Sequence, residues 1–135
     1  MTLETKPTRV LLVDDSVAVL WGLGKLIQGE YPRMTVVGCV ANAGEALVYC
    51  DLEPDVTLLD IDLQGASSLG FIPAIRERSG GEVLVFTGLR DAQVHRQALS
   101  LGALGVVGKD EPGEVVLRAI EQVRQGRPWI SGAAC

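Results

Sequence analysis

The sequence lacks the features of a membrane span, a disulfide-linked fold or a histidine-rich metal centre. Its 135 residues include one histidine, His95, and three irregularly spaced cysteines, Cys39, Cys50 and Cys135, with no Cys-x-x-Cys pair. Such cysteine usage is typical of a reducing compartment. No apolar run approaches the roughly 20 residues of a membrane span, and residues 1–7 do not resemble the start of a secretory signal. We therefore expect a cytoplasmic protein that has no membrane partner.

Basic residues are also in the minority. Lysine and arginine number 12 against 17 acidic residues, which gives a net charge of −5 and a pI near 4.8. Because nucleic acid is bound through a basic surface, the balance argues against direct contact of this chain with DNA or RNA. The length suits one domain of ordinary size.

Five short apolar runs, rich in β-branched side chains, recur along the chain, at residues 10–13, 35–40, 56–59, 83–86 and 104–107. The runs are continuous rather than alternating, which favours strands buried on both faces, as in a parallel sheet. Helical periodicity marks residues 16–29, 43–51, 69–76, 94–101 and 116–123. Ser16 and Asp91 are predicted N-caps, Pro112 suits a first helical turn, and Gly126 suits a helix end. The alternation predicts a (βα)5 fold, a doubly wound five-stranded parallel sheet, with an irregular tail at 127–135.

The residues that end these runs carry the polar chemistry. In chain order they are Asp14, Asp15, Asp60, Asp62, Thr87 and Lys109. Ligands bind to such sheets at the carboxyl ends of the strands, so four carboxylates, a hydroxyl and an ammonium are expected at one edge. Any one of these residues alone is more often a helix cap or a solvated side chain, and the combination is what indicates a site.

Clustered carboxylates repel one another unless a cation binds between them. Oxygen ligands without histidine indicate Mg2+ before Zn2+. A carboxylate beside Mg2+, with a hydroxyl and an ammonium nearby, can act as a nucleophile toward a phosphoryl group. Thr87 and Lys109 would then hold the phosphoryl oxygens.

These residues, in this order, resemble the receiver domain of bacterial two-component response regulators, whose fold is flavodoxin-like. The match includes Val-Asp14-Asp15-Ser, Leu-Leu-Asp60-Ile-Asp62-Leu, Phe-Thr87-Gly88 and Gly-Val-Val-Gly-Lys109, and it extends over residues 8 to about 126. The resemblance implies that Asp60 accepts phosphate from a sensor histidine kinase. It implies that Mg2+ is bound directly by Asp15, largely through water by Asp14, and by the backbone carbonyl of Asp62. Thr87 and Lys109 would sense the phosphoryl group.

The tail Gly126-Arg-Pro-Trp-Ile-Ser131 resembles the segment that precedes a LuxR-type helix-turn-helix. We therefore assign residues 1–126 to the receiver and 127–135 to a tail or the start of a linker, leaving open whether the chain is cut from a longer regulator. The expected function is a phosphorylation-controlled switch in transcription regulation that alters homodimerisation or output-domain contacts. It is not an enzyme beyond its own phosphorylation and dephosphorylation, and DNA would be reached only through an output domain.

The sequence departs from the family pattern at four positions. Gln64 stands where proline is usual, and Ser68 where glycine is frequent, which predicts a different loop after Asp60. Val106 occupies the position of an aromatic residue that turns inward in the usual switch. Asp110 replaces a frequent proline and is expected to disturb little.

Other interpretations remain open. Asp60-Ile-Asp62 also resembles the first motif of haloacid-dehalogenase phosphatases, although their acidic pair comes last in the chain and here Asp14-Asp15 comes first. A flavin-binding fold would need a hydroxyl- and glycine-rich loop after the first strand. A receiver-like interaction module that is never phosphorylated is the remaining alternative, motivated by Val106. Trp21 and Trp129 are expected to be partly buried.

Overall fold

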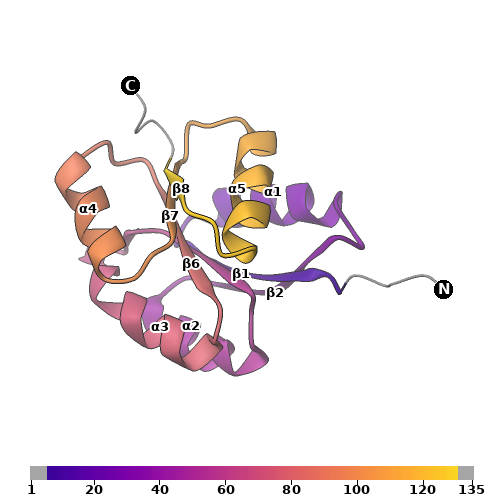
Figure 1. The fold of residues 1–135 in the computed structure, drawn as a ribbon, viewed down its shortest axis with the longest axis horizontal. Helices are drawn as coiled ribbons and strands as arrows, with labels where there is room; N and C mark the ends of the chain where they lie inside the picture. Colours follow the sequence, from indigo (N-terminus) through magenta and orange to yellow (C-terminus); the bar gives the residue numbers. More distant parts are fainter. Residues whose placement is uncertain (1–5, 131–135) are drawn as a thin grey trace.

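The computed structural model describes residues 6–130 and contains a parallel sheet covered by helices on both faces (Figure 1). The order of strands in the sheet is β2-β1-β3-β6-β7-β8. These strands are β1 (Thr8–Val13), β2 (Met34–Val40), β3 (Val56–Leu59), β6 (Glu82–Thr87), β7 (Gly105–Gly108) and β8 (Trp129–Ile130). The helices are α1 (Val17–Gln28), α2 (Ala43–Tyr49), α3 (Ile72–Ser79), α4 (Ala92–Ser100) and α5 (Gly113–Arg124). The predicted doubly wound α/β fold is confirmed.

Short elements complete the chain. Two turns of 3-10 helix, η1 (Cys50–Leu52) and η2 (Leu69–Phe71), precede β3 and α3. A two-stranded hairpin, β4 (Asp62–Leu63) and β5 (Ala66–Ser67), lies between β3 and η2 and forms a separate sheet.

The strand residues divide between two cores. In β1, Leu11 and Val13 pack with α2, α3 and α4, whereas Val10 and Leu12 pack with α1 and α5. All four side chains are at most 1% exposed. Because successive side chains of a strand point to opposite faces, a strand covered on both sides must be apolar throughout. This explains the continuous apolar runs.

Helices α1, α2 and α4 begin where the sequence supplies side-chain caps, whereas α3 and α5 begin without one. Ser16 accepts a hydrogen bond from the N–H of Val19, and Asp91 accepts one from Gln93, so both predicted N-caps are confirmed. Asn42 caps α2 in the same way. Pro112 is the residue immediately before α5, where the absence of an N–H costs nothing.

The C-terminal segment differs from the expectation. Residues 127–130 are not an irregular tail, because Trp129 and Ile130 form β8 and pair in parallel with Gly105 and Val106, which adds a sixth strand. The side-chain amide of Gln122 donates to the carbonyl of Pro128 at 2.6 Å and ties the segment to α5. Residues 131–135, the remainder of the expected tail, lie outside the described residues.

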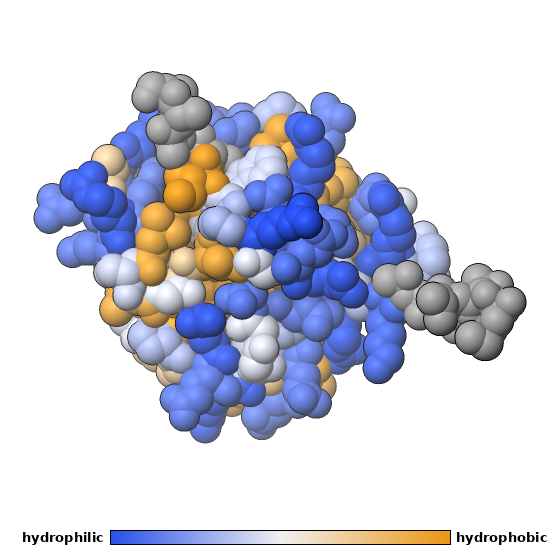
Figure 2. Space-filling model, viewed as in Figure 1, coloured by the Kyte–Doolittle hydropathy of each residue, from blue (hydrophilic) through white to orange (hydrophobic). Residues whose placement is uncertain are grey.

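Two tryptophans were expected to be partly buried. Trp129 is half-buried against the core, but Trp21 on α1 is 68% exposed, so the prediction for Trp21 was wrong. Figure 2 shows a further apolar surface over β8, between α4 and α5. Between residues 6 and 130, no helix is both long enough and apolar enough to span a membrane.

Candidate functional site

Three carboxylates meet at the carboxyl edge of the sheet. Asp14 and Asp15 follow β1 and Asp60 follows β3, which is the parallel neighbour of β1 with Val13 opposite Leu59. One oxygen from each carboxylate lies within 4.8 Å of the others. Asp14 and Asp60 are 2% and 5% exposed, whereas Asp15 lies at the surface.

Lys109 lies between two of these carboxylates. Its Nζ is 2.8 Å from Asp14 Oδ2 and 3.1 Å from Asp60 Oδ2. The lysine follows β7, and its backbone N–H donates to the carbonyl of Thr87 at the end of β6. Burial works against the charge of Lys109, but the bonds to Asp14 and Asp60 outweigh it and raise its pKa above the ordinary value. The ammonium is therefore firmly charged.

The acid that the sequence singles out as nucleophile has a perturbed pKa. Burial raises the pKa of Asp60, the hydrogen bond from Lys109 opposes that change, and the charge of Asp14 adds to it. The net result is a raised pKa, because a second carboxylate and a dry environment both disfavour ionisation. A cation at this place would relieve both effects.

The donor set fits a hard divalent cation. Among residues 6–130, the group of acidic side chains close enough to share an ion consists of Asp14, Asp15 and Asp60. All of the donors are oxygen atoms, which suits Mg2+. The side chain of Asp62 is not in this group. Its Oδ1 accepts a hydrogen bond from the N–H of Gly65. The sequence-based expectation concerns only the backbone carbonyl of Asp62.

The remaining predicted site residues, Thr87 and Val106, lie on the strands β6 and β7. Thr87 is 2% exposed, and its Oγ1 accepts a hydrogen bond from the N–H of Leu89. Val106 is 1% exposed, pairs with Val85 on one side and Ile130 on the other, and packs within the core. The structure thus brings oxygens of Asp14, Asp15 and Asp60 within 4.8 Å of one another and Lys109 within 3.1 Å of Asp14 and Asp60. Thr87 lies at the end of the adjacent strand β6.

Two contacts of the loop after Asp60 were missed by sequence reasoning. The N–H of Gln64 donates to Asp15 Oδ2 at 2.8 Å, and the Ser68 hydroxyl donates to the backbone carbonyl of Asp60 at 2.6 Å. Gln64 has a φ of 56°, which proline cannot adopt, so the backbone at this position is one that the residue usual in the family could not form. The departures at positions 64 and 68 were the available signal.

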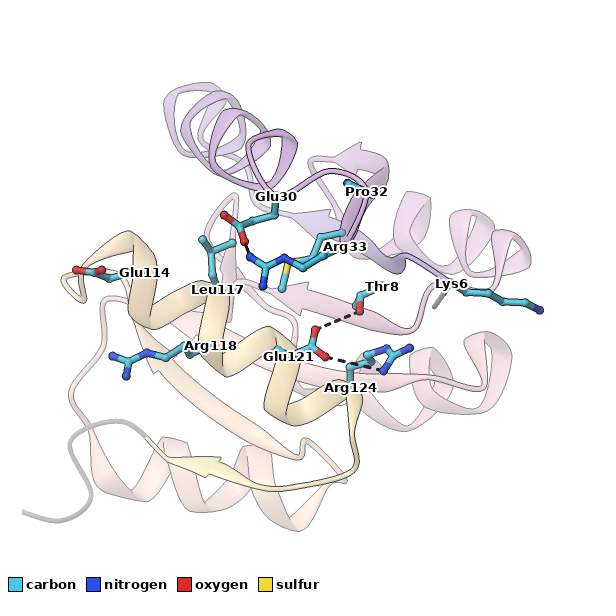
Figure 3. A pocket seen from close by; sticks show the side chains of 11 residues that line it. Lys6, Thr8, Glu30, Pro32, Arg33, Glu114, Leu117, Arg118, Glu121 and Arg124 are labelled. Atoms are coloured by element: carbon cyan, nitrogen blue, oxygen red, sulfur yellow. Dashed lines mark hydrogen bonds and ion pairs between the residues drawn. The ribbon is translucent and has the colours of Figure 1, made fainter. Parts of the chain in front are cut away.

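Two hollows of the surface are not lined by the three carboxylates, although the second reaches the predicted site residue Thr87. One, of about 930 Å3, lies between α5 and the start of β2 (Figure 3). Two of its acidic side chains have basic partners, since Glu30 pairs with Arg33 and Glu121 pairs with Arg124. A second, of about 480 Å3, is lined by residues of the β6–α4 loop together with Val106 and Ile130. Volume alone therefore does not locate the candidate site.

A family comparison agrees with this geometry. Residues 10–121 match the model of the response regulator receiver domain, so the chain belongs to that family. Among curated proteins, it is 32% identical over 130 residues to the nitrate/nitrite response regulator protein NarL of Escherichia coli strain K12. That alignment includes 95% of this chain but 60% of NarL, so the chain spans under two thirds of that relative. It is 36% identical over 112 residues to a protein-glutamate methylesterase/protein-glutamine glutaminase of Rhizobium johnstonii, covering 81% of this chain and 32% of that protein.

Solved structures give the same result. The LuxR-family two-component response regulator from Aurantimonas sp. SI85-9A1 superposes with a TM-score of 0.85 at 32% identity, covering 94% of this chain and 91% of that one. The receiver domain of the NarL regulator from Mycobacterium tuberculosis gives 0.83 at 26% identity, covering 91% and 100%. The expected membership and the resemblance to LuxR-type regulators are confirmed.

Proposed function

We propose that Asp60 accepts a phosphoryl group from a phosphohistidine of a sensor kinase. The observation that carries this proposal is the bridge formed by Lys109 between Asp14 and Asp60, together with an Asp15 oxygen within 4.8 Å of both carboxylates. In the transfer, an Asp60 carboxylate oxygen forms a bond to phosphorus as the N–P bond of the phosphohistidine breaks, and the released imidazole nitrogen takes up a proton. Lys109 would then hold a phosphoryl oxygen by charge and hydrogen bond.

Mg2+ is the cofactor that the donor set supports. Asp14, Asp15 and Asp60, with the backbone carbonyl of Asp62, would hold it. When bound, Mg2+ supplies positive charge to the transferring phosphoryl oxygens. The protein's own contribution is to hold the carboxylates together and to place the Lys109 ammonium against Asp14 and Asp60.

The expected consequence of phosphorylation is a change at the β6 and β7 ends of the sheet. A dianion on Asp60 would draw Thr87 and Lys109 inward and compete with the bond that Thr87 accepts from Leu89. Val106, which lies against β8, would carry the change toward residues 127–135 in place of an aromatic side chain. The output would be a changed homodimer or changed contacts with an output domain.

The domain limits, cellular place and regulated process belong to the same proposal. Residues 1–126 would form the receiver and 127–135 a C-terminal tail or the start of a linker, the first part of which, at Trp129 and Ile130, joins the receiver's sheet as β8. The protein would be cytoplasmic, where a kinase can reach it. NarL is named a response regulator and the Aurantimonas protein is assigned to the LuxR family. We propose by analogy that this chain takes part in transcription regulation, with DNA bound by a separate domain.

The test is phosphorylation with acetyl phosphate and Mg2+, followed by intact mass spectrometry. We expect the gain of one phosphoryl group, lost in Asp60→Asn and retained in the matched control Asp51→Asn, an exposed aspartate in η1. Failure to gain a phosphoryl group from any small donor or cognate kinase would support the interaction module. Sustained turnover of a phosphate ester would support the phosphatase instead.

A further inference from the structure

The loop after Asp60 is a tight hairpin with an unusual backbone. Asp62 pairs with Ser67 and Leu63 pairs with Ala66, which leaves Gln64 and Gly65 as a two-residue turn. Their φ angles are 56° and 81°. Turns of this kind require positive φ at both positions, which glycine adopts readily and glutamine does not. A side-chain-bearing residue is held in a left-handed conformation beside the site, at a cost that other contacts must offset.

The contacts that offset this cost include hydrogen bonds from the loop to Asp15 and Asp60. The turn at Gln64 directs its N–H at Asp15 Oδ2 over 2.8 Å. At the other end of the loop, Ser68 is 2% exposed, and its hydroxyl donates to the Asp60 carbonyl while its N–H donates to the Ile61 carbonyl at 2.7 Å. The same loop therefore contacts the Asp15 carboxylate, which follows β1, and the backbone of Asp60, which follows β3.

We propose that residues 62–68 act as a brace that fixes the site for Mg2+, with the Gln64 N–H and the Ser68 hydroxyl as positioning groups. This inference rests on the proposed Mg2+ site. Asp15 is exposed, so its side chain has rotamers to lose when a cation binds. A hydrogen bond to one of its oxygens restricts those rotamers in advance, as hydrogen bonds to metal-ligating carboxylates do in other metal sites.

Substitutions at Gln64 separate the N–H from the side chain. Proline has no N–H and fixes φ near −65°, so Gln64→Pro removes the bond to Asp15. Asparagine keeps the N–H and tolerates positive φ, so Gln64→Asn is the matched control. By the magnitudes usual for groups behind metal ligands, we expect Mg2+ affinity to fall about tenfold in Gln64→Pro and to change less than about twofold in Gln64→Asn.

A second variant tests the other end of the brace. Ser68→Ala removes the hydroxyl that donates a hydrogen bond to the backbone carbonyl of Asp60, and it should also weaken Mg2+ binding about tenfold. Mg2+ dissociation constants are measured by NMR titration of backbone amides, and phosphorylation by acetyl phosphate is followed as a function of Mg2+. The brace predicts that the Mg2+ concentration at half-maximal rate rises while the rate at saturating Mg2+ changes little.

Hydrogen exchange keeps the proposal testable if Gln64→Pro fails to fold. In the wild-type protein without metal, the Gln64 amide should be protected despite its exposed position, and its exchange should accelerate about tenfold in Asp15→Ala. An unprotected amide, or Mg2+ binding in Gln64→Pro equal to wild type, would overturn the brace. Equal losses in Gln64→Pro and Gln64→Asn would also overturn it. If the wild-type protein itself binds no Mg2+, it is the proposed metal site that fails.

Discussion

Replacing Lys109 by methionine tests whether this lysine compensates two buried charges. Its Nζ lies 2.8 Å from Asp14 Oδ2 and 3.1 Å from Asp60 Oδ2. The two carboxylate side chains are only 3% and 7% exposed. Methionine keeps the unbranched apolar stem of lysine and removes its charge, so Lys109→Met leaves the carboxylates without their cation.

The expected loss of stability follows from burial. Removing one partner of a buried ion pair typically costs about 3–5 kcal/mol, because the other charge stays buried. The Lys109 side chain is 27% exposed, and water screens part of its interaction. We therefore expect a loss near the lower end, about 3 kcal/mol of unfolding free energy at neutral pH without metal.

The pH dependence of this loss has a defined sign. Burial alone would lower the pKa of Lys109, but its bonds to Asp14 and Asp60 raise it above 10.5. Its stabilising effect is therefore complete below pH 10.5 and declines only as the pH rises through the folded-state pKa. In the variant, the already raised pKa of Asp60 rises further because the lowering effect of Lys109 is gone. The deficit should shrink as the pH falls and Asp60 takes up a proton.

The assay is urea unfolding followed by circular dichroism, with a chelator and with excess Mg2+, at about pH 7 and about pH 5. Mg2+ should stabilise Lys109→Met more than wild type, because it supplies the missing positive charge. Lys6→Met is the matched control, since Lys6 is exposed and the change in net charge is identical. A loss no larger than that of Lys6→Met, or an equal Mg2+ effect on wild type and Lys109→Met, would refute the reasoning.

Three further predictions concern single contacts. In the presence of a chelator at neutral pH, Asp60→Asn should increase the free energy of unfolding. The reason is that burial raises the pKa of Asp60, so its negative charge is unfavourable in the folded protein. A variant that unfolds at a lower urea concentration than wild type would contradict this prediction. Gly105→Ala places a Cβ 2.6 Å from the carbonyl oxygen of Trp129, so β8 should detach, at a cost of about 1–3 kcal/mol. Hydrogen exchange of the Trp129 amide measures the detachment, and unchanged exchange in Gly105→Ala would contradict the prediction. Gly24→Ala is the control, because a Cβ at this position meets no atom within 4 Å. Arg90→Met breaks the ion pair between Arg90 and Asp110, whose side chains are 84% and 61% exposed. The free energy of unfolding, measured by thermal unfolding, should therefore change by less than about 0.5 kcal/mol. A larger effect would show that the pair is more than a surface contact.

The main elements of the fold follow from the sequence because each has a local cause. The strand β1 is apolar at successive positions since it is covered on both faces. Ser16 and Asp91 start helices because their side chains accept hydrogen bonds from N–H groups of the first turn. The strand β8 has no such local cause. Its two residues join the sheet through the N–H of Trp129 and the carbonyl of Leu104, a contact between segments far apart in the chain. A sequence pattern over a few neighbouring residues cannot predict such a contact.

The candidate site was also predictable only in part. Strand ends placed Asp14, Asp15 and Asp60 at one edge, because neighbouring parallel strands end together. The contribution of Gln64 was not predictable from residue type, since the interacting group is its backbone N–H and any residue except proline has one. Only the positive φ of the turn directs that N–H at Asp15.

The acidic site is a source of instability that the surrounding structure must offset. Asp14 and Asp60 carry like charges in a dry environment, and one lysine is shared between them. Replacing a buried ion pair by apolar residues of similar volume is often neutral or stabilising, so stability of the fold alone does not explain why the cluster is present. The raised pKa of Asp60 indicates the same, because it reports a carboxylate whose charge the folded protein disfavours. A positive ion and a reactive phosphorus are the partners that make use of that charge, which is the physical reason to expect function at this edge of the sheet.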